Sequence, residues 1–181
     1  TSPTTAVNLN GPGFAYGTYV LRWTVTSGSC PTDFVDVNVT FNQAPTATAI
    51  DINSICLAST GTAIPLGGTI GGGATTGSWQ PVTVAGTVGA STVVGNAVTA
   101  TYTSSLTDYS NGTPIIVKLV ASGAAACTPA EQQITINVDR TPVPVATTPR
   151  NTCSNFIVLD AESPIPYSAT GLWTGPAGVT F

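Results

Sequence analysis

Residues 18–41 read TYVLRWTVTSGSCPTDFVDVNVTF, and residues 115–138 read IIVKLVASGAAACTPAEQQITINV. In both stretches an apolar run ends at a Ser-Gly turn signal, a cysteine follows, and a second run alternates apolar and polar residues. An alternation with period two places successive side chains on opposite faces of a strand. Each stretch therefore predicts a β-hairpin with one buried face and one solvated face.

The two hairpins belong to a longer internal repeat. Three landmarks recur at one spacing of 97 residues: Cys30 and Cys127, Pro45 and Pro142, and Cys56 and Cys153. A Gly-x-Trp motif recurs at a spacing of 94 residues, at Trp79 and Trp173. One extra residue in the second hairpin turn aligns Arg22 with Lys118 and Trp23 with Leu119.

This repeat predicts the domain organisation. Residues 46–141 make one complete repeat, residues 1–45 are the second half of a preceding repeat, and residues 142–181 are the first half of a following one. About 97 residues with several short strands and no helical periodicity are typical of an Ig-like antiparallel β-sandwich. We therefore predict an all-β chain of tandem Ig-like repeats, and its short Pro-containing junctions predict a stiff rod.

The remaining strands of the complete repeat are expected from apolar and β-branched runs. They cover residues 46–52, 63–66, 77–84 and 93–103. The Gly-rich stretch 67–73 is predicted to be a loop between strands, because a phosphate-binding loop would need a Lys and a following helix.

Composition excludes several classes of function. Charged residues make up only 7% of the 181 residues, the net charge is −4, and there is no His. With four Lys and Arg residues, the chain offers no basic footprint for nucleic acid or for an anionic membrane surface. No apolar run reaches the ~18 residues of a membrane span. Residues 1–30 lack the pattern of a signal peptide, so we expect a leader either to have been removed or to lie upstream.

Three segments carry a resemblance to a known family. The hairpin run at residues 17–30, the ICLASTG start at residues 55–61 and the GGGATTGSW run at residues 71–79 resemble Ig-like or PKD-like repeats of large Bacteroidota cell-surface adhesins. Those adhesins are exported by type IX secretion and serve gliding and attachment. The resemblance implies an extracellular or cell-surface location and an adhesive or structural role, and it supplies no catalytic residue.

Four cysteines in a chain without His favour disulfides over a zinc site, whose ligands come in closely spaced pairs. Free thiols in the core and a metal site are the alternatives. Within the complete repeat we expect Cys56 to bond Cys127, which would stabilise the domain by roughly 4 kcal/mol in the chain-entropy model. By the same alignment, Cys153 of one unit is expected to bond Cys30 of the next.

Tryptophan recurs at one position of the repeat, which is typical of the core Trp of a sandwich. We therefore predict Trp79, Trp173, Trp23 and Leu119 to be core residues. The alternative for an exposed Trp is stacking on a sugar.

No enzymatic chemistry is apparent in the sequence. Asp33, Asp36 and Glu131 are predicted to be solvated surface charges, since a catalytic carboxylate needs a partner and a pocket. No catalytic residue, cofactor or metal site is therefore expected. Two further possibilities stay open: a calcium site from loop carboxylates (Asp51, Asp108, Asp139, Asp160) and N-glycosylation at Asn38 or Asn111.

The sequence thus predicts a structural and adhesive module of an extracellular filament. Its partner would be a second unit, because residues 142–181 of one unit and residues 1–45 of the next together supply most of one sandwich. A surface polysaccharide is a further candidate partner. The alternative is a non-catalytic carbohydrate-binding or spacer segment of a secreted multidomain enzyme.

Overall fold

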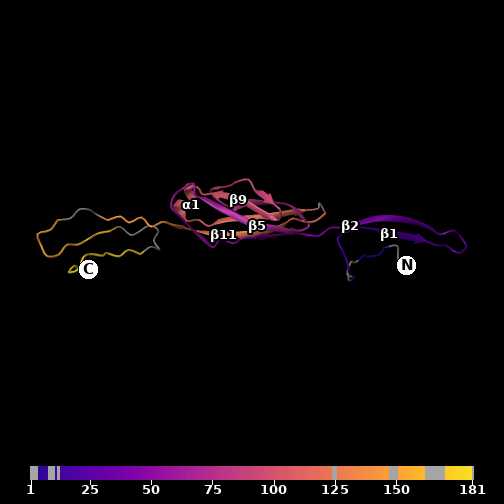
Figure 1. Cartoon of the computed structure of the whole chain (residues 1–181), viewed down its shortest axis with the longest axis horizontal. Helices are drawn as coiled ribbons and strands as arrows, with labels where there is room; N and C mark the ends of the chain where they lie inside the picture. The colour runs from indigo at the N-terminus through magenta and orange to yellow at the C-terminus, as the bar shows by residue number, and fades with distance from the viewer. Residues whose placement is uncertain are drawn as a thin grey trace.

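The computed structural model describes residues 4–7, 11, 13–123, 126–146, 151–161 and 170–180. A hairpin, a two-sheet sandwich and a C-terminal segment follow one another along the long axis of the molecule (Figure 1). The hairpin and the C-terminal segment therefore lie at opposite ends of the sandwich. The elements are β1 (Gly17–Val25), β2 (Asp33–Phe41), β3 (Pro45–Ala49), β4 (Ser54–Leu57), β5 (Ala63–Gly72), β6 (Ala74–Thr83), β7 (Thr87–Val88), β8 (Thr92–Val94), β9 (Ala97–Thr103), α1 (Leu106–Asn111), β10 (Ile115–Gly123) and β11 (Ala130–Arg140).

The sandwich is built from two sheets. One has the strand order β4-β11-β10-β6, and the other has the order β3-β5-β9-β7, with β8 also paired to β9. Among the described residues, paired strands of the sandwich are antiparallel except for β4, which runs parallel to β11. This arrangement confirms the all-β, Ig-like fold that the alternation predicted.

The chain changes sheets near the start of the sandwich. β3 pairs with β5 in one sheet, and β4 then joins the other sheet beside the last residues of β11. The sequence did not predict β4, whose four residues are too short for an alternation to stand out. β4 places Cys56 directly opposite Asp139.

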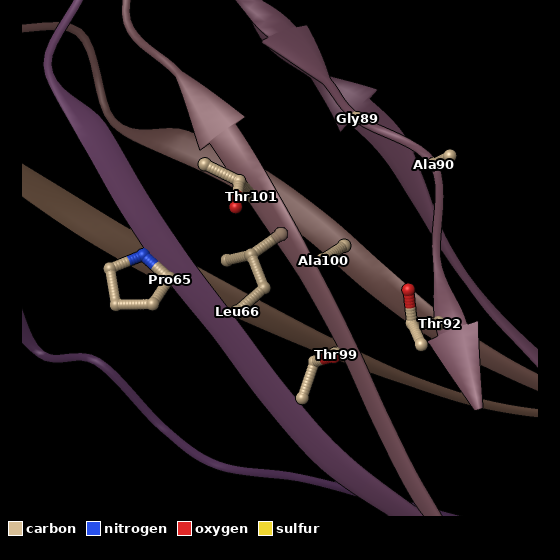
Figure 2. A pocket seen from close by; sticks show the side chains of 8 residues that line it. All are labelled: Pro65, Leu66, Gly89, Ala90, Thr92, Thr99, Ala100 and Thr101. Atoms are coloured by element: carbon tan, nitrogen blue, oxygen red, sulfur yellow. The ribbon is translucent and has the colours of Figure 1, made fainter. Parts of the chain in front are cut away.

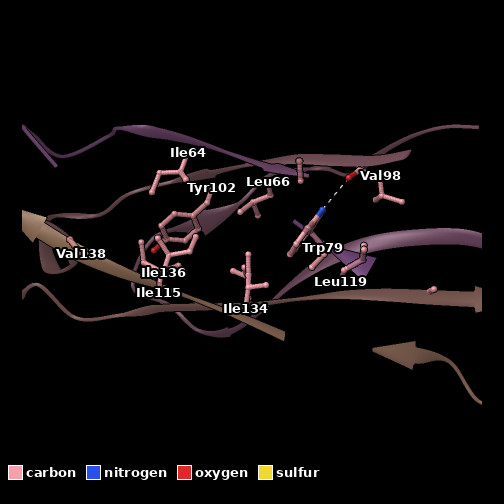
Figure 3. Packing of buried hydrophobic residues seen from close by; sticks show 14 of the residues in the cluster. Ile64, Leu66, Trp79, Val98, Tyr102, Ile115, Leu119, Ile134, Ile136 and Val138 are labelled. Carbon is pink, nitrogen blue, oxygen red and sulfur yellow. Dashed lines mark hydrogen bonds between the residues drawn. The ribbon is translucent and has the colours of Figure 1, made fainter. Parts of the chain in front are cut away.

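The core lies between the two sheets (Figure 3). Trp79 and Leu119 oppose each other on β6 and β10, and they are 4% and 0% exposed. The Trp79 indole Nε1–H donates to the carbonyl of Val98 at 3.3 Å. The core prediction is confirmed for these two residues, because alternate positions of each strand face the opposite sheet.

The prediction of a loop at residues 67–73 was wrong. Strand β5 continues through Gly72 and pairs with both β3 and β9. At Gly68 an added Cβ would lie 2.7 Å from Leu119 Cδ2 and 2.8 Å from the Thr48 carbonyl oxygen. Glycine at this position thus permits the close approach of β3 and the packing of Leu119, as it does elsewhere in strands.

A buried polar network closes one end of the sandwich. The Tyr102 hydroxyl donates to Asp108 Oδ2 at 2.7 Å and accepts from the Gly86 amide at 2.8 Å. The Ser105 amide donates to the same carboxylate oxygen at 2.7 Å. Asp108 is at once the third residue of α1 and half of its capping box with Ser105. The network therefore ties β9, α1 and the turn before β7 together.

The Tyr102 phenol makes the stability of the sandwich pH-dependent at high pH. Burial, with the Asp108 hydrogen bond as the second cause, raises the pKa of Tyr102 well above its ordinary value of 10. The neutral phenol is favoured in the folded state, so this stabilisation is fully present below pH 10 and is lost as pH rises toward the folded-state pKa. We expect Tyr102→Phe to be less stable by about 1–3 kcal/mol at pH 8 and to lose less stability above pH 10 than the parent chain. Urea unfolding at several pH values measures both effects, and equal pH dependence in the two proteins would contradict the assignment.

Candidate interaction surface

Strands β1 and β2 form a two-sided ribbon. Their register places Tyr19 opposite Val39, Leu21 opposite Val37 and Trp23 opposite Val35. Because side chains alternate along each strand, one face of the ribbon is apolar. We call it the hairpin face; it consists of Tyr19, Leu21, Trp23, Val25, Val35, Val37, Val39 and Phe41.

The hairpin face is largely uncovered in this chain. Trp23 is 40% exposed and Val37 is 51% exposed. A shallow depression of about 360 Å³ adjoins it, lined by Trp23, Val25, Asp33, Phe34 and Val35. A continuous exposed apolar surface of this kind marks an interaction site in a folded protein.

The matching face of β10 and β11 is buried. Arg22 opposes Asp36 in the hairpin, and Lys118 opposes Gln133 in the sandwich. Asp36 and Gln133 are 97 residues apart, so the two hairpins have the same register when Arg22 is aligned with Lys118. The side chains that align with the hairpin face then include Leu119, Ile134 and Ile136, all at most 5% exposed. In the sandwich this face is covered by the sheet that contains β3, β5 and β9.

The opposite face of the hairpin is polar. Arg22 Nε and Nη2 donate to the two carboxylate oxygens of Asp36, at 2.7 and 2.9 Å. The Arg22 guanidinium also lies 3.8 Å from the centre of the Phe34 ring. The guanidinium holds the pKa of the Asp36 carboxyl below its usual range. The ion pair is exposed and so adds little stability, but it identifies the solvent face of the ribbon.

An aromatic cluster covers one end of the hairpin face. The Phe14 ring packs edge-on against Phe41, with ring centres 6.4 Å apart, and Tyr19 packs against Phe41 at 5.9 Å. The Tyr19 hydroxyl donates to the Ala15 carbonyl at 2.6 Å. The sequence analysis did not single out Phe14, since its role depends on how the chain before β1 folds back.

The C-terminal segment carries uncovered apolar side chains of its own. Among its described residues, Ala146 and Ala161 form an isolated antiparallel β-bridge. Trp173 is 41% exposed. The predictions that Trp23 and Trp173 are core residues were wrong for this chain as it stands, because no second sheet covers either residue among the described parts. Other exposed apolar residues here are Val143, Val145, Phe156, Ile157, Val158, Leu159, Leu172 and Val179.

The predicted bond between Cys56 and Cys127 was also wrong. Cys56 pairs with Asp139 near the end of β11, whereas Cys127 lies just before Ala130 at its start. These two ends of β11 are about 30 Å apart at ~3.3 Å per residue, far beyond the ~7 Å Cα separation of a disulfide. All four cysteines are thiols in the structure. Cys30 lies in the loop between β1 and β2, and Cys153 lies in the C-terminal segment at the other end of the molecule (Figure 1).

The carboxylates and cysteines considered as metal or catalytic groups do not come together in the described part of the chain. Within the described ranges, no three Cys, Asp or Glu residues come together as metal ligands. Asp108 is engaged by Tyr102 and Ser105, while Asp33, Asp36, Asn38 and Glu131 are exposed as expected. No helix in the described part of the chain is long and apolar enough to cross a bilayer.

A second depression lies on the sandwich, beside β5 and β9 (Figure 2). Its volume is about 450 Å³, and its lining contains only Pro, Leu, Gly, Ala and Thr side chains. Without a charged group or an imidazole it offers no acid, base or metal ligand. The hairpin face is therefore the stronger candidate surface.

The strand order defines the class of the protein as an Ig-like β-sandwich. No family model matches the chain, and no curated protein matches it. Similar solved structures include a chimeric titin Z1Z2 functionalised with a KLER peptide from decorin, with 8% identity, 55% of this chain and 98% of that chain covered, and a TM-score of 0.39. A complex of titin M10 with an obscurin-like 1 Ig domain shares 12% identity, with 56% and 100% covered and a TM-score of 0.37. The protocadherin gammaB4 extracellular domain shares 14% identity, with 81% and 26% covered and a TM-score of 0.43. Likeness at these identities concerns the fold and assigns no function to this chain.

Proposed function

We propose that this chain is a structural and adhesive module of an extracellular or cell-surface filament. Residues 142–181 of one unit and residues 1–45 of the next build one composite Ig-like domain, head to tail. The supporting observation is the hairpin face: it is uncovered here, yet its aligned counterpart on β10 and β11 forms half of the sandwich core. Residues 142–181 align with the part of the repeat that holds β3 to β6, and the large apolar side chains among their described residues are exposed as well.

A contact of this kind produces a filament. The hairpin and the C-terminal segment lie at opposite ends of the molecule (Figure 1). Each unit can therefore bind one neighbour through its hairpin and another neighbour through its C-terminal segment. Such heterologous contacts continue indefinitely unless they close a ring. A filament that spans distance needs no catalytic site, and we include the absence of enzymatic activity in the proposal. The assignment to Bacteroidota adhesins rests on the sequence resemblance alone.

One observation favours a second function, binding of a surface polysaccharide. The exposed Trp23 ring beside its depression could stack on a sugar ring. A pull-down on insoluble polysaccharides tests this alternative, and loss of binding in Trp23→Ala would support it.

The composite domain is tested with a fusion of two copies of the full chain. A second copy of residues 88–97 joins them, because these residues fall between the positions that align with Phe181 and Thr1. We expect amide exchange in β1 and β2 of the second copy to slow by about 100-fold or more relative to the single chain, kept dilute enough to be monomeric, since opening should then cost roughly 3 kcal/mol. Exchange followed by mass spectrometry measures this.

Two variants in the second copy provide the control. Val37→Asp places a charge on the hairpin face and should abolish the added protection. Val20→Asp places the same charge on the polar face, at a residue 65% exposed, and should retain it. Exchange as fast in the fusion as in the single chain, or equal effects of the two variants, would refute the composite domain. Sedimentation of the single chain then distinguishes separate subunits, which associate, from stretches of one long polypeptide.

A further inference from the structure

The two cysteines of the sandwich lie at opposite ends of it, and each lies beside a junction between repeats. Cys56 Sγ is 3.5 Å from Thr141 Oγ1, where the chain leaves the sandwich. Cys127 Sγ is 3.7 Å from the Gln43 carbonyl oxygen and 4.0 Å from that of Asn42, where the chain enters it. Each sulfur therefore reaches the linker rather than the domain interior.

The repeat shows that these two junctions are equivalent. Asn42 and Gln43 align with Asp139 and Arg140 at the constant spacing of 97 residues. Cys56 is in register with Asp139. At each junction, the domain that ends there contributes the cysteine at the position of Cys56, and the domain that begins there contributes the hairpin-loop cysteine at the position of Cys127. Both cysteines would lie against the same two linker residues.

One of the two contacts of Cys127 lies on the side of the junction strand that Cys56 occupies. The amides of Asn137 and Thr141 donate to the carbonyls of Asn53 and Leu57, on the β4 side of β11. Backbone groups alternate sides along a strand, so the Asp139 carbonyl faces β4 as well. Its counterpart is the Asn42 carbonyl, one of the two oxygens that Cys127 Sγ approaches.

We propose that the cysteines form disulfides between successive domains: the residue at the position of Cys56 bonds the residue at the position of Cys127 in the following domain. The proposal rests on the composite domain proposed above. For successive units it pairs Cys56 with Cys30 of the next unit, and Cys153 with Cys127 of the next unit. Cys56 lies one strand spacing, about 4.8 Å, from Asp139, and the cysteine of the following domain would lie against that same residue, so both cysteines meet at one point of the junction.

Each bond is a two-electron oxidation. Two cysteine thiols lose two protons and two electrons as the S–S bond forms, and a disulfide oxidant is reduced to two thiols. Cys30, Cys56 and Cys153 are exposed and Cys127 is partly exposed, so an oxidant can reach them. A bond at each junction would limit bending of a rod that the short Pro-containing linkers already stiffen.

The experiment uses the same two-copy fusion, oxidised with glutathione disulfide at low protein concentration. The products are alkylated and cut without reduction by an endoproteinase specific for the amino side of Asp. Cuts at Asp33, Asp51, Asp108, Asp139 and Asp160 place each cysteine on its own peptide. The peptide across the join carries Cys30 of the second copy and is thereby distinguished from Cys30 of the first.

We expect peptide 51–107 to be linked to the join peptide, and peptide 139–159 to be linked to peptide 108–138. Cys56→Ser in the first copy should leave Cys30 of the second copy reduced, whereas Cys56→Ser in the second copy should leave that bond intact. Slowed exchange in the hairpin together with Cys56–Cys127 or Cys30–Cys153 bonds, or with no bonds, would overturn the cross-link and leave the composite domain standing. Hairpin exchange that stays fast would overturn the composite domain and, with it, this pairing.

Discussion

Trp79→Ala is expected to lower the free energy of unfolding of the sandwich by about 3–5 kcal/mol. Trp79 is 4% exposed and lies between the sheets against Leu119 (Figure 3). Its removal leaves a cavity and deprives the buried Val98 carbonyl of the indole N–H. Since a domain is commonly stable by only 5–15 kcal/mol, a large part of the population would be unfolded in mild denaturant.

Urea unfolding followed by far-ultraviolet circular dichroism measures this loss, because the fluorescence of Trp79 is absent in the variant. Trp173→Ala is the matched control: Trp173 occupies the aligned position but is 41% exposed. It should change the stability of the sandwich by less than about 1 kcal/mol. Similar losses in the two variants would mean that Trp79 does not hold the two sheets together.

Asp108→Ala is expected to cost about 3 kcal/mol or more. One carboxylate oxygen accepts from the Tyr102 hydroxyl and from the Ser105 amide, each at 2.7 Å. Alanine would leave both donors without this partner and remove the capping box of α1. The effect should exceed that of Tyr102→Phe, which removes a hydroxyl and leaves the carboxylate bonded to Ser105.

Chemical denaturation at neutral pH gives the comparison. Asp51→Ala removes the same charge from an exposed site and should leave stability within about 0.5 kcal/mol of the parent chain. Asp108→Asn keeps one oxygen acceptor and should recover part of the loss. If Asp51→Ala and Asp108→Ala were equally destabilising, net charge rather than the network would be the cause.

The hairpin face could be predicted from sequence because it is a local property. Val35, Val37 and Val39 alternate with polar residues, and a strand sends alternate side chains to opposite faces wherever it lies. The same rule, together with the internal repeat, predicted the burial of Trp79 and Leu119 in the complete repeat. It could not tell that Trp23 and Trp173 would be exposed, since exposure depends on whether a second sheet is present to cover them.

Non-local geometry decided the remaining features. In the sequence, Asp108 looks like a solvated carboxylate of a loop. Only the tertiary structure places it where its carboxylate accepts a hydrogen bond from the Tyr102 hydroxyl. The glycines at residues 67–73 suggested a loop, and only the approach of β3 and Leu119 explains why a strand needs them there. Cys56 and Cys127 lie near the two sequence ends of one repeat, which suggested a bond between them.

By itself, then, the sequence determined the strand alternation, the Ig-like class and the spacing of the repeat, because these follow from local periodicity along the chain. Only the tertiary structure decided which ends of the strands meet. Cys56 lies on β4 beside the last residues of β11, whereas Cys127 lies just before the first residue of β11. The length of one extended strand therefore separates the two cysteines. The physical reason is that a strand advances ~3.3 Å per residue, and sequence proximity to a domain boundary does not say at which end of the sandwich a residue lies.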